Sequence, residues 1–343
     1  MTMQIGVHYG SSTDFPSVLD DIVAYEGAGL NVAWLGESYG YDSPTALGAL
    51  AARTSTIRLG PAILAVQTRS AALIAMTAAG LDAVSNGRAL LCLGSSGPAV
   101  VEGLHDRDFG APVAHTRLVI EQCRALWAGE RIASGRSANG AAPYRGLKLI
   151  HRPDRPIPIY VAAVGDRNVA MAGEIADGWM PVFFWPERAR DIWAEPLALG
   201  SSMRSADLGE LQISVTTPLA IDIGTEAAML THRAGLAHYI GGMGTKETNF
   251  YLRLATRYGF GDVGERIQDL YLAGERSEAI ELVPDEFACS TALIGDEATV
   301  AKRLAAYRAA GVTILNVIPQ GDTRETRVDH VRRLLSLAGH TNT

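Results

Sequence analysis

The chain has 343 residues, of which 48% are hydrophobic and 20% charged, a balance typical of a globular protein with an ample core. Its formal net charge is -7 and no basic stripe is visible, which argues against a nucleic-acid partner. The cysteines Cys92, Cys123 and Cys289 show no CxxC spacing and no nearby histidine cluster, which argues against structural zinc and favours a reducing compartment.

Short apolar runs alternate with segments of helical spacing along the whole chain. The first half predicts strands at residues 4–9, 31–37, 57–66 and 89–93, with helices at 15–28, 44–53, 70–84 and 112–127. The second half predicts strands at residues 156–163, 178–184, 211–221 and 312–319, with helices at 168–176, 186–203, 299–310 and 325–337. Two stretches interrupt this alternation. Residues 129–155 are expected to be irregular, and residues 224–284 to be mostly helical.

Eight strands alternating with eight helices predict parallel βαβ units that close into a single α/β domain, a (β/α)8 TIM barrel over residues 1–343. The helical insertion would lie between strands seven and eight, and the irregular insertion after helix four. An internal sequence repeat supports this prediction, because residues 24–30 (AYEGAGL) are similar to residues 306–312 (AYRAAGV). A doubly wound open sheet is the alternative, although no GxGxxG follows the first strand.

A loop of small residues follows the fourth strand, in the sequence NGRALLCLGSSGP at residues 86–98. The loop, Gly94-Ser95-Ser96-Gly97, lies at the carboxyl end of a strand, where α/β folds bind their ligands. Without large side chains, its backbone N–H groups can approach an anion or a flat ring. The loop is therefore a candidate ligand site, although many Gly/Ser loops are only turns.

Three polar residues at strand ends are candidate catalytic groups. Glu37 follows the second strand and could serve in acid–base chemistry, or it could be a helix cap or an ion-paired carboxylate. His8 ends the first strand and could donate a proton, or it could be a buried histidine bonded to backbone. Ser38 could orient a substrate carbonyl or cap a helix. No Ser/His/Asp arrangement and no metal-ligand spacing stands out, so no metal is expected.

Aromatic residues near strand ends could form a wall for a flat ring. They are Tyr39, Trp34, Phe183, Phe184 and Trp185. For Trp34, which lies inside a strand, core packing is the better interpretation. Of Phe183 and Phe184, at least one is expected to face the pocket.

Several longer segments, spread from the first strand to the last helix, resemble one known family. They are AWLGESYGYDS, IRLGPAILAV, LDAVSNGRALLCLGSSGPAVVEGLH, PIYVAAVGDRNVAMAGEIADGW, HYIGGMGTKETNF and IQDLYLAGERSEAIELVP. Through these segments the chain resembles the luciferase-like monooxygenase superfamily. Within it, the chain is similar to the oxidoreductases that use the deazaflavin coenzyme F420, such as those like methylene-tetrahydromethanopterin reductase.

The resemblance implies a barrel whose carboxyl-terminal face binds the deazaflavin ring in an apolar pocket. The phosphate-bearing tail would run along Gly94, Ser95, Ser96 and Gly97 on one side and Val164, Gly165 and Asn168 on the other. Phe183 would contribute to the ring pocket. The family also carries a non-proline cis peptide behind the ring, which the resemblance assigns to the Ala62–Ile63 bond.

For other residues in the matching segments, more than one role stays open. His105, with Glu102, could bind the tail or fix its loop, and Arg167 could neutralise a phosphate or lie on the surface. The glycines at residues 241–244 suggest a tight turn between helices that doubles as a pocket wall. Two departures matter: Cys92 replaces a usual glycine, and the family members that act on alcohols carry a histidine where this chain has Ser38.

The resemblance thus implies an F420-dependent oxidoreductase that transfers a hydride to or from a small organic substrate at a C=C, C=N or C=O bond. Reduction is favoured because the alcohol-oxidising histidine is missing. The alternatives are an FMN-dependent luciferase-like monooxygenase and a catalytically silent flavin-binding protein. No basic leader and no membrane-spanning apolar run is seen, so we expect a cytoplasmic protein. The family often dimerises, which implies a homodimer here.

Overall fold

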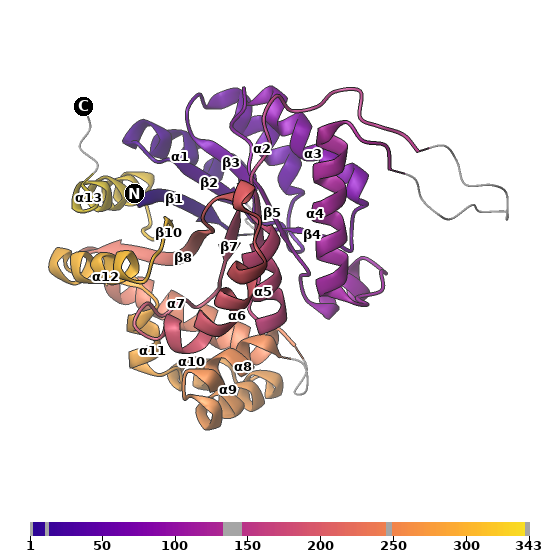
Figure 1. Ribbon diagram of the computed structural model, residues 1–343. Coiled ribbons are helices and arrows are strands. Elements are labelled where there is room, and N and C mark those ends of the chain that lie inside the picture. The colour runs from indigo at the N-terminus through magenta and orange to yellow at the C-terminus, as the bar shows by residue number, and fades with distance from the viewer. Residues whose placement is uncertain (1–2, 11–13, 133–145, 245–248, 340–343) are drawn as a thin grey trace.

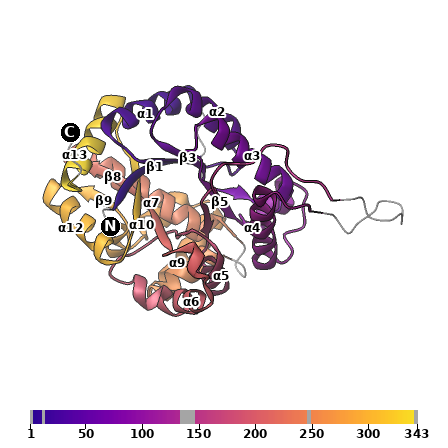
Figure 2. The ribbon, with the colours of Figure 1, turned by 45° about the horizontal axis from the view of Figure 1, so that its top comes forward.

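The computed structural model describes residues 3–10, 14–132, 146–244 and 249–339. Its strands form a ring with helices around it (Figures 1 and 2). The strands are β1 (Gln4–Tyr9), β2 (Val32–Leu35), β3 (Arg58–Pro61), β4 (Leu64–Ala65), β5 (Leu91–Gly94), β6 (Ile159–Ala162), β7 (Gly178–Met180), β8 (Gln212–Ile221), β9 (Leu293–Gly295) and β10 (Ile314–Pro319). The helices outside the ring are α1 (Phe15–Ala28), α2 (Ser43–Arg53), α3 (Ala71–Val84), α4 (Pro112–Ala128), α5 (Asp166–Ile175), α6 (Ala189–Met203), α12 (Glu297–Ala309) and α13 (Arg324–Leu337).

All strand pairs in the ring are parallel, in the order β3-β2-β1-β10-β8-β7-β6-β5-β4. Of the ten strands, β3 and β4 share one position, and β9 lies outside this order and pairs in parallel with the end of β8, so the ring has eight positions. A parallel bridge between Leu59 and Ala89 joins β3 to the segment before β5, next to the β4–β5 pair. The predicted TIM barrel is therefore confirmed.

Local sequence signals explain where several barrel helices begin and end. The Asp42 carboxylate accepts from the Thr45 N–H at 2.9 Å and caps α2, whereas Ser70 caps α3 by accepting from the Leu73 N–H at 3.2 Å. Gly29 takes the left-handed conformation, with φ 102°, that ends α1. These caps fix the loops that lead into and out of the strands, and the Asp42 cap lies close to the site described below.

The barrel interior is filled with side chains inside the strand ring and is open at the carboxyl ends of the strands. Large side chains pack inside the ring, among them Trp34 and Tyr160, whose ring centroids lie 5.1 Å apart. Gly60 leaves room for this packing, since a Cβ there would lie 2.6 Å from the Trp34 ring. Trp34 is fully buried, which confirms that it is a core residue. Above this layer the inward residues are small, and they leave space for a cavity.

The peptide bond between Ala62 and Ile63 is cis, at the position that the resemblance implies.

Four features of the barrel differ from the sequence prediction. The strand expected at 57–66 is split into β3 and β4. The strand expected at 178–184 ends at Met180, because Phe183 has a φ of 49° that is incompatible with an extended strand. The short strand β9 and a π-helical turn at Ala99–Leu104 were not predicted.

The expected insertion after β8 is helical, as predicted. Its helices are α7 (Thr225–Gly242), α8 (Phe250–Arg257), α9 (Gly261–Ala273), α10 (Arg276–Glu281) and α11 (Asp285–Ser290), of which α8 to α11 gather at the lower side of Figure 1. Gly241 and Gly242 let α7 approach α9, since added Cβ atoms would lie 2.4 and 2.6 Å from the Tyr271 side chain. Of the other insertion, residues 133–145 lie outside the described residues, and Ile132 and Leu147 form an antiparallel bridge.

A buried charge cluster joins the first and last helices of the barrel, which lie side by side in Figures 1 and 2. Asp21 of α1 is 2% exposed and accepts from Arg324 Nε at 2.8 Å and Arg327 Nη2 at 2.7 Å. The Tyr9 hydroxyl of β1 also donates to it, at 2.7 Å. No helix among the described residues is long and apolar enough to cross a lipid bilayer.

Candidate active site

A cavity of about 830 Å³ opens at the carboxyl ends of the strands. This volume lies within the range of small-molecule sites, roughly 300–1,000 Å³. The residues predicted as catalytic or cofactor-binding all line it: His8, Glu37, Ser38, Ala62, Ile63, Gly94, Ser95, Ser96, Gly97, Val164, Gly165, Asn168 and Phe183. Residues far apart in the sequence therefore meet at one cavity, as expected for strand ends of a parallel barrel.

The floor of the cavity is made of small side chains. Ala62, Gly94 and Ala162 come from three neighbouring strand positions, where inward side chains would otherwise fill the ring. An added Cβ at Gly94 would lie 2.7 Å from Ile63 Cδ1, so a larger residue there would displace Ile63. This floor leaves a flat ligand room to lie directly above the barrel core.

Two groups of backbone N–H donors face the cavity from neighbouring loops. Ser96 and Gly97 follow β5, whereas Gly165, Asp166 and Arg167 form the start of α5 after β6. Within the described part of the chain, none of these N–H groups donates to another protein group. Free N–H groups at a helix N-terminus and in a small-residue loop are suited to binding a phosphate.

His8 lies in the wall of the cavity, and one of its two ring nitrogens has no hydrogen-bond partner among the described residues. Its Nε2 lies 3.5 Å from the Ala62 carbonyl oxygen, and its buried Nδ1 has no partner among the described residues. Burial lowers the pKa of His8, and the bond to Ala62 opposes this only in part, so the imidazole is neutral at pH 7. Because a carbonyl oxygen only accepts, Nε2 carries the proton when this bond forms and Nδ1 keeps a free lone pair.

Glu37 is held by a paired arginine. Its oxygens accept from Arg69 Nη1 at 2.6 Å and Nη2 at 3.0 Å, and Oε2 also accepts from the Ser43 N–H and hydroxyl, each at 3.1 Å. The structure therefore shows the ion-paired carboxylate that was one of the two interpretations of Glu37. Its role in acid–base chemistry stays a prediction. Ser38 lies beside it with a φ of 44°, in the loop before α2.

An aromatic wall closes another side of the cavity. The Phe183 ring packs edge-on against Tyr239 of α7 and Tyr251 of α8, with centroids 5.5 and 5.9 Å away. Phe184 and Trp185 are instead buried in the core outside the ring. The expectation that at least one of Phe183 and Phe184 faces the pocket is thus met by Phe183.

The sequence reasoning missed several residues of the site. Arg69 lies at the end of the turn before α3 and carries no local signal that would pair it with Glu37. His232, Tyr239 and Tyr251 come from the helical insertion, whose register against the barrel has no counterpart in the local sequence pattern. His232 Nε2 lies 2.9 Å from Thr291 Oγ1, and burial above all lowers its pKa to about 4.

The remaining candidate residues line the cavity or pack beside it. His105 and Arg167 line the cavity, whereas Glu102 accepts from the Phe109 N–H at 3.4 Å and so helps to fix the loop after β5. Gly241 and Gly242 pack on α9, and Met243 beyond them lines the cavity. No group of three or more His, Cys, Asp or Glu residues within the described residues could hold a metal ion.

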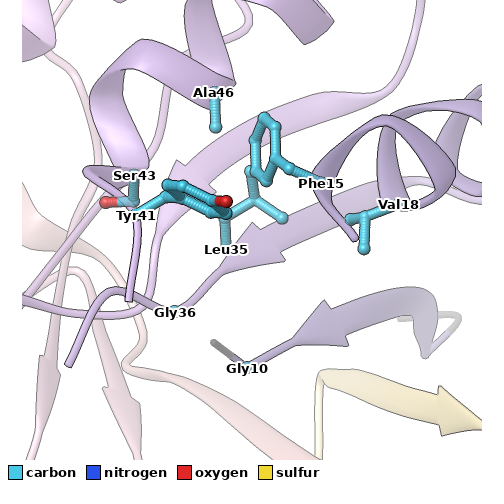
Figure 3. A pocket seen from close by; sticks show the side chains of 8 residues that line it. All are labelled: Gly10, Phe15, Val18, Leu35, Gly36, Tyr41, Ser43 and Ala46. Atoms are coloured by element: carbon cyan, nitrogen blue, oxygen red, sulfur yellow. The ribbon is translucent and has the colours of Figure 1, made fainter. Parts of the chain in front are cut away.

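A second, much smaller crevice lies behind the loop that carries Glu37 (Figure 3). Its volume is about 10 Å³, and Phe15 and Tyr41 meet in it edge-on with centroids 5.7 Å apart. Ser43, which bonds Glu37, also lines it. The crevice is too small for a ligand and serves to pack the β2–α2 loop against α1.

The parallel strands and this cavity define an α/β-barrel protein with a candidate ligand site at the carboxyl ends of its strands. The chain belongs to the luciferase-like monooxygenase family, whose sequence model matches residues 1–313. The family predicted by resemblance is therefore confirmed.

Among curated relatives, a protein of Mycobacterium tuberculosis assigned as a coenzyme F420-dependent oxidoreductase is 35% identical over 319 residues. That alignment covers 89% of this chain and 91% of the relative. An F420-dependent glucose-6-phosphate dehydrogenase of Beutenbergia cavernae is 29% identical over 188 residues, which cover 51% of this chain and 53% of the relative.

Solved structures share the fold at low sequence identity. The coenzyme F420-dependent tetrahydromethanopterin reductase of Methanopyrus kandleri aligns with a TM-score of 0.78 and 23% identity, covering 97% of this chain and 98% of the other. An F420-dependent secondary alcohol dehydrogenase, in complex with an F420–acetone adduct, aligns with a TM-score of 0.79 and 14% identity, covering 98% and 99%.

Proposed function

We propose that the protein is a coenzyme F420-dependent oxidoreductase. It transfers a hydride between C5 of the deazaflavin and a small organic substrate with a C=C, C=N or C=O bond, and reduction is the favoured direction. Support comes from the cavity, in which two groups of free N–H donors stand beside a flat floor of small residues. The relative from Mycobacterium tuberculosis that is assigned as F420-dependent, and whose alignment covers 89% of this chain, gives independent support.

The residues present fit the cofactor. The N–H groups of Ser96 and Gly97 and those at the start of α5 would hold the phosphate of its tail, with Arg167 nearby to offset the charge. Ala62, Ile63 and Gly94 would lie against the ring. The amide oxygen of Asn168 is buried without a partner in the described residues and would accept from a ligand donor.

When bound, the deazaflavin supplies two-electron hydride chemistry, and the protein supplies binding, orientation and the proton. We assign the proton transfer to Nδ1 of His8, which has a free lone pair, while the Nε2–H stays bonded to the Ala62 carbonyl oxygen. In the oxidising direction Nδ1 accepts a proton from the substrate. In the reducing direction the ring first takes up a proton at Nδ1 and then donates it to a substrate oxygen or nitrogen, and burial favours this release because it disfavours the charged ring. Both carboxylate oxygens of Glu37 are already bonded, so we assign Glu37 to holding the loop that carries Ser38.

An absorbance titration of the purified protein tests the proposal. F420 and FMN are added separately, and we expect F420 to bind at least tenfold more tightly. Tighter binding of FMN would favour the luciferase-like monooxygenase, and binding of both cofactors without turnover of any acceptor would favour a silent flavin-binding protein. A structure with F420 bound would then show which side chains face C5.

We extend the proposal to a cytoplasmic homodimer. Support comes from the free thiols of all three cysteines and from the exposed apolar side chains of Leu73 and Met76 on α3 and Leu118 on α4. Light scattering at micromolar concentration tests the dimer, and a charged residue in place of Met76 should then give a monomer.

A further inference from the structure

The cavity has two chemically different ends. Its charged lining side chains are Glu37, which is paired with Arg69, and Asp166 and Arg167, which lie at the start of α5. The lining residues from the described part of the insertion after β8 carry no charge: Thr231, His232, Gly235, Leu236, Tyr239, Met243, Phe250, Tyr251 and Thr291. The imidazole of His232 is also neutral at pH 7, since burial lowers its pKa to about 4. The described residues of the insertion that line the cavity therefore present an uncharged surface to a molecule that shares the cavity with the cofactor.

Two tyrosine hydroxyls at this end have no protein partner. Tyr239 and Tyr251 pack against each other with ring centroids 4.8 Å apart, and both line the cavity. Neither hydroxyl makes a hydrogen bond to any group in the part of the chain that the structure describes. Burial raises the pKa of Tyr251, and burial followed by the nearby Tyr39 phenol raises that of Tyr239. Both hydroxyls therefore stay protonated at neutral pH and remain available as donors.

The frame that carries these two tyrosines is tightly packed. Phe183 contacts both rings, and Tyr258 donates to the Phe183 carbonyl oxygen at 3.0 Å. The Tyr271 hydroxyl, one helix further out, bonds His238 Nδ1 at 2.7 Å and so fixes α9 against α7. Donors held in place by packing lose little entropy when a ligand binds, which favours a role in recognition.

We infer that the substrate of this site is an uncharged, largely apolar molecule with a hydrogen-bond-accepting oxygen, and that Tyr239 and Tyr251 bind this oxygen. The inference rests on the proposed function, which gives the other end of the cavity to the cofactor. Anionic substrates are disfavoured at this end, because their charge would lose water without meeting a cation among the described residues of the insertion that line the cavity. A phosphorylated sugar, the substrate named for one relative, belongs to the disfavoured class.

A matched pair of probes tests the substrate class. Benzylideneacetone is an uncharged aromatic enone, and cinnamate has nearly the same shape with a carboxylate in place of the acetyl group. Calorimetric titration of the F420-loaded protein at pH 7.5 should show the enone binding at least tenfold more tightly than cinnamate. Equal or tighter binding of cinnamate, or binding of glucose 6-phosphate, would overturn the inference.

Three Tyr→Phe variants test the tyrosines. Tyr239→Phe and Tyr251→Phe each remove only a hydroxyl and should weaken enone binding about two- to tenfold, the worth of one neutral hydrogen bond. Tyr41→Phe is the control, because the exposed Tyr41 side chain lies outside the cavity, and it should leave enone binding unchanged. Unchanged binding in both cavity variants would refute the assignment.

The same titrations on the protein without F420 separate the two proposals. If F420 does not bind at all, the proposed function fails. The preference for the enone and its loss in the two cavity variants would still be measured on the free protein, so the substrate inference stands or falls on its own.

Discussion

The guanidinium of Arg69 and the carboxylate of Glu37 meet in two nearly parallel hydrogen bonds of 2.6 and 3.0 Å at the edge of the cavity. Their side chains are only 15% and 11% exposed, so little water competes for these bonds. Arg69 also donates to Asp42, which caps α2, at 3.0 Å. The pair thus ties the loop after β2 to the turn before α3, and a change to either residue should act on both.

Glu37→Gln and Arg69→Met should each lower the free energy of unfolding by about 1–3 kcal/mol, because each leaves a partly buried polar group without its charged partner. The double variant should lose less than the sum of the two. Urea denaturation of the four proteins gives the coupling energy. If Glu37 carries the proton, Glu37→Gln alone should lower kcat by about 10²–10⁴-fold and Arg69→Met should not, which would contradict our assignment to His8.

Gly165→Val should weaken F420 binding at least tenfold while changing the melting temperature little. No atom lies within 4 Å of an added Cβ at this position, so the protein has room for the new side chain. Because Gly165 lines the cavity at the start of α5, we expect this side chain to crowd the phosphate that is proposed to bind there. Gly80→Ala in α3 is the control, since it is equally unhindered and lies away from the cavity. Gly178→Ala should instead damage the fold, because its Cβ would overlap the Tyr160 ring. Unchanged affinity in Gly165→Val would place the phosphate elsewhere.

Acid should destabilise the protein in part through His232. Its pKa is about 4 in the folded state and 6.5 for a free histidine, so the unfolded chain takes up the proton first as the pH falls. This contribution is fully present above pH 6.5 and is lost between pH 6.5 and about 4, at a cost of up to about 3 kcal/mol. His232→Gln should flatten the pH dependence of urea denaturation in that window, whereas His151→Gln at an exposed position should not.

Oxygen should play no part in turnover. A deazaflavin has carbon in place of the flavin N5, so its reduced form reacts slowly with oxygen and passes electrons mainly as hydride. Reduced F420 should therefore be oxidised by an enone acceptor at the same rate in air and in an anaerobic cuvette, without peroxide. Oxygen uptake that follows turnover would instead favour the monooxygenase.

The barrel could be predicted from the sequence because its signals are local. Each β-strand is a short apolar run, and residues such as Gly29 and Asp42 mark helix ends by their own conformation or side chain. Strand-end residues such as His8 and Gly94 could likewise be placed together, because parallel strands of a barrel all end on the same face.

What escaped prediction depends on contacts between distant segments. The pairing of Glu37 with Arg69 spans 32 residues and leaves no periodic pattern in the sequence. Tyr239 and Tyr251 lie on helices whose apolar faces could have packed in several ways, and their place depends on contacts between helices such as the close approach of α7 to α9 at Gly241. Phe183 leaves the strand region because its backbone is in the left-handed conformation, which a phenylalanine seldom adopts.

Asp21 and its partner Arg324 are separated by 303 residues, and β1 pairs with β10, so the first strand and helix depend on the last ones. A ribosome makes β1 long before β10 exists. Until β10 and α13 have been made, the growing chain must carry an open sheet edge at β1 and a carboxylate on α1 without its arginine partners. Such an edge invites wrong strand pairing. The ring can close only once β10 has left the ribosome, and Arg324 and Arg327 of α13 then bond Asp21 and hold the first helix to the last one.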